Sequence, residues 1–229
     1  MNIKEKLNYF TRFEKTLWLC SFLLVVLSSV CFGTDNYVTI IASLIGTTSL
    51  IFIAKGNPIG HLLMVIFSTL YAAISFEYRY YGEMMTYLGM SAPMSILSLI
   101  SWVKNPYGSK KSEVRVNSIS IKEIPIILIL TSVVTFIFYY VLLYFGTANI
   151  LPSTISVTTS FFALCLSFRR TPYFALAYAA NDIVLIVLWS IAAVNNISYL
   201  SMIVCFVVFL VNDTYSFVNW KRMHRLQKQ

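Results

Sequence analysis

The sequence has few charged residues and few histidines. Only 11% of its 229 residues are charged, whereas soluble domains carry roughly 25%, and its mean hydropathy is +0.75. It has two histidines and contains no HExxH, GxSxG or GxxxxGK[ST] pattern. The composition excludes an ordinary water-soluble domain. The missing motifs argue against the common hydrolases and against a pump driven by nucleotide hydrolysis.

The cysteines offer neither a cross-link nor a metal site. All four lie inside apolar runs, and no two of them form a CxxC pair; they are Cys20, Cys31, Cys165 and Cys205. Without that spacing, the sequence predicts no disulfide framework and no zinc site. We expect the four thiols to behave as small hydrophobic side chains, and we expect no metal and no cofactor.

The main feature of the sequence is a series of eight long apolar runs. Most of them are close to the roughly 20 residues that a helix needs to cross hydrocarbon. The runs are Leu17–Phe32, Tyr37–Ala54, Ile59–Phe76, Tyr81–Val103, Ile124–Phe145, Ser153–Phe168, Pro172–Val194 and Tyr199–Trp220. The sequence therefore predicts an all-α integral membrane protein with both termini on one side. For the first run, which is short and follows a basic segment, a cleavable signal peptide or a peripheral surface helix is the alternative.

Lysine and arginine separate to one side of this topology. Sixteen of the seventeen fall in segments that share a side, and only Arg79 lies on the other. Because cytoplasmic loops are enriched in these residues, we expect a cell-membrane protein with both termini in the cytoplasm. A net charge of +8 would suggest a nucleic-acid partner in a soluble protein. Here retention of basic loops and attraction to anionic headgroups explain it, so no nucleic acid is expected.

The second half of the chain repeats the first. The aligned pairs include Tyr81 with Tyr199 and Trp102 with Trp220 at an offset of 118 residues, and Pro58 with Pro172 at an offset of 114. Spans two to four and six to eight thus form two three-helix units. The fifth span turns the chain over between them, so the units are parallel. The predicted fold is a 3+1+3 transmembrane bundle of two parallel repeats plus an extra N-terminal helix, one of the plans known for transporters.

These boundaries divide the chain into five parts. They are a cytoplasmic N-terminus with a peripheral helix at 1–35, a first three-helix repeat at 36–104, a cytoplasmic loop with a linker helix at 105–150, a second three-helix repeat at 151–220, and a basic cytoplasmic tail at 221–229. If the repeats enclose a site, it should lie near the midplane of the membrane, where they meet.

Polar residues inside two adjacent spans are the first candidates for that site. Asn181 and Asp182 lie near the middle of the seventh span, and Asn212 and Asp213 lie in the second half of the eighth. Ionisable groups within a span are costly and mark functional candidates. Successive residues sit about 100° apart on a helix, so the two members of a pair cannot both point at one ligand. Interhelical hydrogen bonding is the structural alternative for all four.

Aromatic residues provide a second group of candidates. Trp189 follows Asn181 by eight residues, which places both on roughly one helix face. Its repeat partner is Tyr71, at the offset of 118 residues. An amide beside a flat aromatic wall would suit a planar heterocyclic ligand. Packing against neighbouring helices is the alternative for Trp189.

The chain resembles a known family at three motifs. Tyr81-Gly82-Glu83 opens the fourth span, Trp102-Val103-Lys104 closes it, and Asn212 precedes Trp220 ahead of the basic tail. With the 3+1+3 plan, these residues resemble the PnuC-type vitamin transporters, which are related in architecture to the SWEET sugar carriers. The resemblance covers spans two to eight. It implies import of nicotinamide riboside by facilitated diffusion, with trapping by cytosolic phosphorylation. Carriers of thiamine, riboflavin or deoxynucleosides in the same family are the alternatives.

The resemblance also suggests substrate-binding positions. The family's motif, Trp-x-x-Trp-x-x-x-Asn, places its asparagine at Asn181 and its two tryptophans at Phe174 and Ala177. The chain therefore keeps the amide and lacks both indoles. Tyr173 and Tyr178 are candidates to replace them. The departure leaves the substrate open within the family.

Two other classes of function remain as alternatives. We expect His61, beside a turn, and His224, in the tail, to be solvated, so the chain is predicted not to be an enzyme. An intramembrane aspartyl enzyme would have to use Asp182 and Asp213. A membrane ligand sensor that transports nothing is the second alternative. The expected partners are a small-molecule substrate and the lipid bilayer, and a homo-oligomer stays open.

Overall fold

The computed structural model describes residues 9–32, 37–77, 81–108, 110–147, 149–194 and 196–229. In these ranges, eight helical segments are long and apolar enough to cross a membrane, which confirms the all-α prediction. The helices are α2 (Arg12–Cys31), α3 (Tyr37–Ala54), α4 (Ile59–Glu77), α5 (Tyr81–Thr86), α6 (Ala92–Val103), α7 (Glu123–Tyr144), α8 (Ile150–Phe168), α9 (Tyr173–Ala193) and α10 (Leu200–Leu226), with a 3₁₀ turn, η2, at Ile197–Tyr199. Lys4, Lys6 and Arg79, whose sides were predicted, lie outside these ranges.

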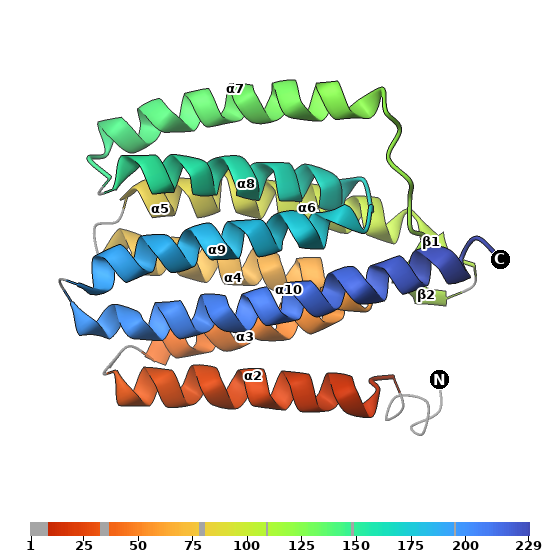
Figure 1. Ribbon diagram of the computed structural model, residues 1–229, viewed down its shortest axis with the longest axis horizontal. Coiled ribbons are helices and arrows are strands. Elements are labelled where there is room, and N and C mark those ends of the chain that lie inside the picture. The colour runs from red at the N-terminus through yellow and green to blue at the C-terminus, as the bar shows by residue number, and fades with distance from the viewer. Residues whose placement is uncertain (1–8, 33–36, 78–80, 109, 148, 195) are drawn as a thin grey trace.

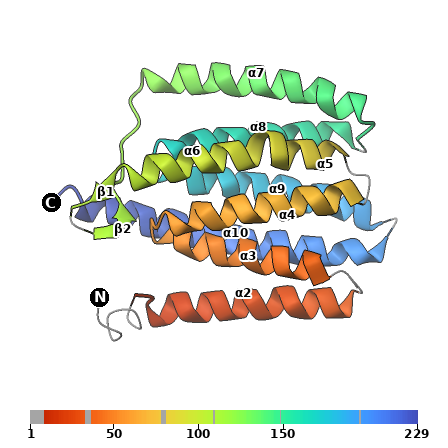
Figure 2. The same ribbon diagram turned by 180° about the vertical axis from the view of Figure 1, so that it is seen from behind.

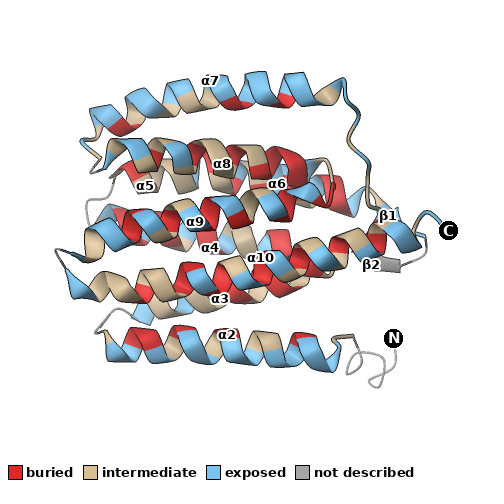
Figure 3. Ribbon diagram, in the orientation of Figure 1, coloured by how far each residue is buried: buried red, intermediate tan, exposed pale blue. Residues whose placement is uncertain are grey.

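The helices run alongside one another in a single bundle (Figure 1). The first triplet is α3, α4 and the α5–α6 segment, and the second is α8, α9 and α10. Helix α10 packs against both α9 and α3, so the two triplets meet through it. Helices α2 and α7 lie on opposite outer sides in both views (Figures 1 and 2). The buried residues concentrate on the inner helices (Figure 3).

Helix α2 begins five residues before its predicted start, because a cap extends it. Glu14 N donates to Thr11 Oγ1 at 3.2 Å, and Thr11 N donates to Glu14 Oε2 at 2.7 Å, which is a capping box. The same carboxylate is buried, pairs with Lys55 Nζ at 3.2 Å and accepts a hydrogen bond from Tyr215 at 2.7 Å. Glu14 therefore ties the N-terminal helix to the end of α3 and to the side of α10.

The turn between the first and second helices of each triplet contains one residue with a left-handed backbone conformation. Gly56 follows α3 with φ +69°, and Arg170, 114 residues later, follows α8 with φ +58°. Gly56 N donates to Ile53 O, and Arg170 N donates to Ser167 O, each at 2.9 Å. A left-handed residue just past a helix end is a common way to stop a helix. Both triplets therefore turn between their first and second helices in the same way.

The two tryptophans of the predicted repeat make reciprocal contacts between the triplets. Trp102 Nε1 donates to Ser167 O, and Trp220 Nε1 donates to Ile53 O, both at 2.9 Å. Their donors are 118 residues apart and their acceptors 114, the offsets seen in the sequence. Both indoles are completely buried, and their ring centroids lie 5.0 Å apart. Each triplet thus binds the first helix of the other through an equivalent residue.

The residues just before these tryptophans repeat the pattern. Ser101 Oγ donates to Phe168 O, and Asn219 Nδ2 donates to Ala54 O, each at 2.8 Å. The side chains differ in chemistry, yet each caps a terminal carbonyl of the opposite triplet's first helix. These matched contacts agree with the predicted parallel repeat.

The fourth span is not a continuous α-helix. A π-helical turn, η1 (Tyr87–Ser91), separates α5 from α6, and Ala92 N donates to Tyr87 O across it. Pro93 follows directly and has no N–H with which to continue the α-helical ladder. Such π turns are frequent at functional sites. The sequence predicted one continuous span here, and the structure places an irregularity just before Pro93.

A short hairpin and a helix extension at one end of the bundle were not predicted. Strand β1 (Pro106–Tyr107) pairs antiparallel with β2 (Lys110–Val114). Val114 N donates to Gly56 O at 2.9 Å, and Val116 N donates to Gln227 Oε1 at 2.7 Å. These bonds hold the connection against α10, which continues to Leu226 through most of the predicted tail. We call this the basic end, because it holds Lys55 of the α3–α4 turn, Lys104 and Arg115 on either side of the hairpin, Arg169 and Arg170 of the α8–α9 turn, and the Lys and Arg of the α10 terminus.

The expectation that His61 is solvated is wrong. Its side chain is 2% exposed and lies edge-on to Trp102, with ring centroids 4.3 Å apart. Its Nε2 is 3.2 Å from Ser167 Oγ. Although His61 follows a turn in the sequence, the second triplet covers that turn, so the ring becomes part of the contact between the triplets.

Candidate functional site

A cavity of about 90 Å³ lies between the two triplets. Every helix of both triplets contributes to its wall, together with the end of α7. The polar lining residues are Ser68, Glu83, Thr86, Tyr87, Ser91, Ser95, Ser153, Ser156, Ser160, Tyr178, Asn181, Asp182 and Asp213. The apolar ones are Leu50, Ile53, Met64, Phe67, Leu142, Val157, Leu164, Leu185, Phe206 and Phe209. A central site between repeats is where substrate binds in transporters of this plan.

Three carboxyl groups face this cavity from different helices. Glu83 comes from α5, Asp182 from α9 and Asp213 from α10, and the two aspartates are direct neighbours. No Lys, Arg or His is among the described residues that line the cavity. Two carboxylates side by side repel each other unless they share a proton or a cation lies between them. The cavity is therefore suited to a shared proton or to a positively charged guest.

Asn181 is held in a fixed orientation by helix α8. Its Oδ1 accepts hydrogen bonds from Ser156 Oγ at 3.1 Å and from Thr159 Oγ1 at 2.8 Å. The residue is 6% exposed and lines the cavity. Because these hydroxyls occupy the carbonyl oxygen, the NH₂ group is the part of the amide that can bind a ligand.

Several buried polar atoms in the wall have no partner among the described residues. They are Ser68 Oγ, Ser95 Oγ and Asp182 Oδ2, and each of these side chains is at most 3% exposed. Buried polar atoms in proteins are nearly always hydrogen-bonded, and leaving one unpaired costs roughly 1–3 kcal/mol. A polar ligand in the cavity would provide these partners, so these atoms indicate a binding site.

Aromatic rings form part of the same wall. Tyr87, which lies on the π turn, lines the cavity together with Tyr178 and Phe206. Tyr71 does not line the cavity; it packs behind Tyr87, with ring centroids 4.4 Å apart. Flat rings beside hydroxyl and carboxyl groups would suit a ligand that has an aromatic ring and polar edges.

The two positions that correspond to the family's tryptophans lie away from the cavity. Phe174 is completely buried against Trp220, with ring centroids 4.9 Å apart, and belongs to the contact between the triplets. Ala177 faces an outer groove beside α7. The side chain that does turn toward the cavity is Tyr178, one residue further along α9.

Two other sequence candidates also lie elsewhere. Trp189 packs against Tyr199 near the opposite end of the bundle from the hairpin, with ring centroids 5.2 Å apart. Asn212 Nδ2 donates to Ser21 Oγ of α2 at 2.9 Å and to Val208 O at 2.8 Å. Of the eight candidates from the sequence, the structure brings Asn181, Asp182 and Asp213 together in the cavity.

Sequence reasoning missed Glu83 and the serines. Glu83 lines the cavity from α5. Its position two residues inside an apolar span was the available signal, because ionisable groups within a span mark functional sites. The serines gave no such signal, since serine is common in membrane helices, where it lets them pack closely.

Comparisons with known proteins agree with one another. The family model described as "Nicotinamide mononucleotide transporter" matches residues 36–222. The nicotinamide riboside transporter PnuC of Neisseria mucosa is 25% identical over 224 residues, covering 96% of this chain and 85% of that protein. PnuC of Haemophilus influenzae is 20% identical over 210 residues, covering 91% and 90%. A crystal structure of the vitamin B3 transporter PnuC has the same fold, with a TM-score of 0.80, 24% identity and coverage of 95% and 94%.

Proposed function

Since this chain belongs to the nicotinamide mononucleotide transporter family, the family of the PnuC proteins, we propose that it imports nicotinamide riboside. The chain is a multi-pass membrane transporter and not an enzyme. The proposed path runs through the cavity between the two triplets. The basic end would face the cytoplasm, because Lys and Arg are retained on that side.

The observation that carries the proposal is the chemistry of the cavity wall. Nicotinamide riboside combines a flat, positively charged pyridinium ring with a carboxamide and ribose hydroxyls. Asp182 and Asp213 would balance the ring charge, and the Asn181 NH₂ group would donate to an oxygen of the ligand. Ser68 and Ser95 have free hydroxyls for the ribose. These acids, this amide and these hydroxyls thus each have a counterpart on the ligand.

The same wall ranks the alternative substrates. Thiamine also carries a permanent positive charge on an aromatic ring, so the carboxyl groups would favour it too. Riboflavin and deoxynucleosides are neutral and would leave the acids without a cation. We therefore retain thiamine as the second candidate and place the neutral ligands behind it.

Transport would require the cavity to widen. Its volume of about 90 Å³ is well below the roughly 300 Å³ of the smallest usual ligand pockets. Rocking of one triplet against the other would open it to each side in turn. The π turn at Tyr87–Ser91 lies in the wall and is a suitable place for the first triplet to bend. Such a cycle needs no energy source, so we propose facilitated diffusion with trapping by phosphorylation in the cytosol.

Uptake by the purified full-length protein in proteoliposomes tests this proposal. Radiolabelled nicotinamide riboside should enter without an imposed Na⁺ or proton gradient, and uptake should stop when the inside and outside concentrations are equal. Excess unlabelled thiamine should compete more strongly than riboflavin or a deoxynucleoside. Empty liposomes are the control for leakage.

Three outcomes would contradict parts of the proposal. Uptake of thiamine without nicotinamide riboside would replace the substrate and leave the path in place. Accumulation above the outside concentration only with an ion gradient would contradict facilitated diffusion. Saturable binding of the riboside without any flux would indicate the sensor instead of the transporter.

A further inference from the structure

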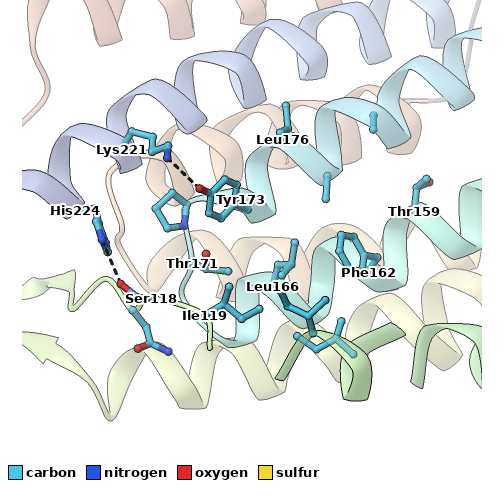
Figure 4. A pocket seen from close by; sticks show the side chains of 16 residues that line it. Ser118, Ile119, Thr159, Phe162, Leu166, Thr171, Tyr173, Leu176, Lys221 and His224 are labelled. Atoms are coloured by element: carbon cyan, nitrogen blue, oxygen red, sulfur yellow. Dashed lines mark hydrogen bonds between the residues drawn. The ribbon is translucent and has the colours of Figure 1, made fainter. Parts of the chain in front are cut away.

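A groove on the outside of the bundle is unrelated to the central cavity. It has a volume of about 770 Å³ and lies between α7, α8 and α9, with α10 at one end (Figure 4). Its walls are apolar along the helices, with Ile127 from α7, Phe162 and Leu166 from α8, and Leu176 and Ala180 from α9. We call it the α7–α9 groove. From Tyr173 to Ala180 it extends about 10 Å along α9, at 1.5 Å per residue.

The basic end closes the groove with polar and charged groups. Lys221 Nζ lies 3.2 Å from Tyr173 Oη and 4.7 Å from the centroid of that ring. His224 Nε2 lies 3.3 Å from Ser118 Oγ, as Figure 4 shows. The aliphatic part of Lys221 can thus cover apolar surface while its ammonium group stays at the polar end.

A second pocket continues from this end of the groove. It has a volume of about 390 Å³ and shares Asn117, Ser118 and His224 with the groove. Its cationic lining residues are Arg115, Arg170 and Lys228. We call it the basic pocket. The groove and the basic pocket form one continuous depression, apolar at membrane depth and cationic at the surface.

No carboxylate lines this depression in the part of the chain that the structure describes. Arg170 Nη1 donates to Ser101 Oγ at 2.7 Å, and its Nε donates to Arg115 O at 3.2 Å, so both acceptors are neutral. Burial, together with the neighbouring Arg169 and Arg115, lowers the pKa of Arg170. Two carboxylates lie beside the pocket without lining it: Glu123 pairs with Arg169 at 2.7 Å, and Glu113 Oε1 accepts a hydrogen bond from Gln227 Nε2 at 3.1 Å.

We propose that an anionic phospholipid binds here, with its headgroup phosphate in the basic pocket and one acyl chain in the α7–α9 groove. Basic pockets between membrane helices on the cytoplasmic side suit such headgroups. A free phosphate compound would leave the apolar groove unfilled. A zwitterionic lipid would bring no net negative charge to the four cationic side chains of the depression, Arg115, Arg170, Lys221 and Lys228. The inference does not depend on which substrate the transporter carries.

Titration of delipidated, full-length protein with defined lipids tests this proposal. Native mass spectrometry would count bound molecules of dioleoyl phosphatidylglycerol, of phosphatidylcholine with the same acyl chains, and of water-soluble glycerol phosphate. We expect phosphatidylglycerol to bind at least about fivefold more tightly than phosphatidylcholine, the factor expected from about 1 kcal/mol per cation. Glycerol phosphate should not compete at the same concentrations.

Two variants assign the binding to this place. Arg115→Gln combined with Lys228→Gln removes two exposed charges and should weaken phosphatidylglycerol by about fivefold per charge, with no effect on phosphatidylcholine. Ala180→Phe fills the groove and should weaken both lipids. Arg12→Gln on α2, on the far side of the bundle (Figure 1), is the control and should bind both lipids as the unmodified protein does.

The result that would overturn the proposal is equal affinity for the two lipids in the unmodified protein. The proposal would also be overturned if the double variant preferred phosphatidylglycerol as strongly as the unmodified protein does. The negative charge of the lipid would then be recognised by residues outside the basic pocket. Displacement of the lipid by glycerol phosphate alone would reassign the pocket to soluble phosphates. Thermal unfolding of each variant, compared with the unmodified protein, shows whether a loss of binding reflects loss of the fold.

Discussion

The two triplets are alike at the basic end of the bundle and unlike at the cavity. At the basic end, Trp102 and Trp220 donate equivalent hydrogen bonds of 2.9 Å across the interface. At the cavity, Asp213 of the second triplet stands 118 residues after Ser95 of the first, and both line the wall. The shared contacts build a nearly symmetric scaffold. The differing residues make the two sides of the cavity chemically different, so the cavity can bind an unsymmetrical ligand in one orientation.

The difference also distinguishes the two Asn-Asp pairs. Asn181 and Asp182 both line the cavity, whereas Asn212 turns to Ser21 of the N-terminal helix and only Asp213 reaches the cavity. Helix α2 lies outside both triplets, so the amide of Asn212 serves assembly. Identical dipeptides on neighbouring helices thus have different roles.

The largest expected effect tests the symmetry of the scaffold. Trp102→Ala and Trp220→Ala should each lower the free energy of unfolding by about 3–5 kcal/mol, as for other fully buried aromatic residues. Because each variant loses a completely buried indole and an equivalent hydrogen bond of 2.9 Å, the two losses should be similar in thermal unfolding followed by size-exclusion chromatography. Trp18→Ala, which removes a half-buried ring bonded to Thr48, should cost less. A large difference between Trp102 and Trp220 would contradict the equivalence of the triplets.

The next effect tests the asymmetry of the cavity. Asp182→Asn should weaken nicotinamide riboside by at least about tenfold, because one partner of a buried charge pair is lost. The reduced riboside, which has the same shape and no positive charge, should bind the variant about as well as it binds the unmodified protein. Calorimetric titration of both ligands measures this difference. Equal weakening of both would show that Asp182 contributes shape or stability instead of charge.

The smallest effect concerns the matched turns. Gly56→Ala should lower the free energy of unfolding by about 1–2 kcal/mol, the usual cost of a left-handed backbone for a residue with a Cβ. The added carbon would also meet Met223 Cε at 2.7 Å, which must move. Gly108→Ala is the matched control, since it has φ +57° and nothing within 4 Å of the added carbon. In thermal unfolding, Gly56→Ala should have the lower melting temperature of the two variants. A lower melting temperature for Gly108→Ala would be inconsistent with the observed packing.

Most of the fold could be predicted from the sequence, because membrane-spanning helices are recognised as long apolar runs. The observed helix α3 has the predicted bounds, Tyr37–Ala54. The π turn before Pro93 and the hairpin at 106–114 could not be predicted. The hairpin depends on bonds to Gly56 and Gln227, which are distant in the sequence. His61 was misjudged for the same reason, since the residues that bury it come from the other triplet.

The candidate site was harder to predict than the fold. A polar dipeptide in a span shows that its side chains need hydrogen-bond partners. It does not show which member faces the ligand and which faces a neighbouring helix. The rotation between successive residues predicted that the members of each Asn-Asp pair would diverge. Asn212 and Asp213 do so, whereas Asn181 and Asp182 both line the cavity. The motif positions Phe174 and Ala177 could not be placed without the rotation of α9. Their roles in substrate binding remain predictions.

The most direct test of the central claim compares the two asparagines. Initial uptake of labelled nicotinamide riboside into proteoliposomes should be lost in Asn181→Ala. Uptake should persist in Asn212→Ala, which removes the same amide from the contact with α2. Wild-type uptake by Asn181→Ala, in protein that is folded and inserted, would contradict a substrate path through the cavity between the triplets.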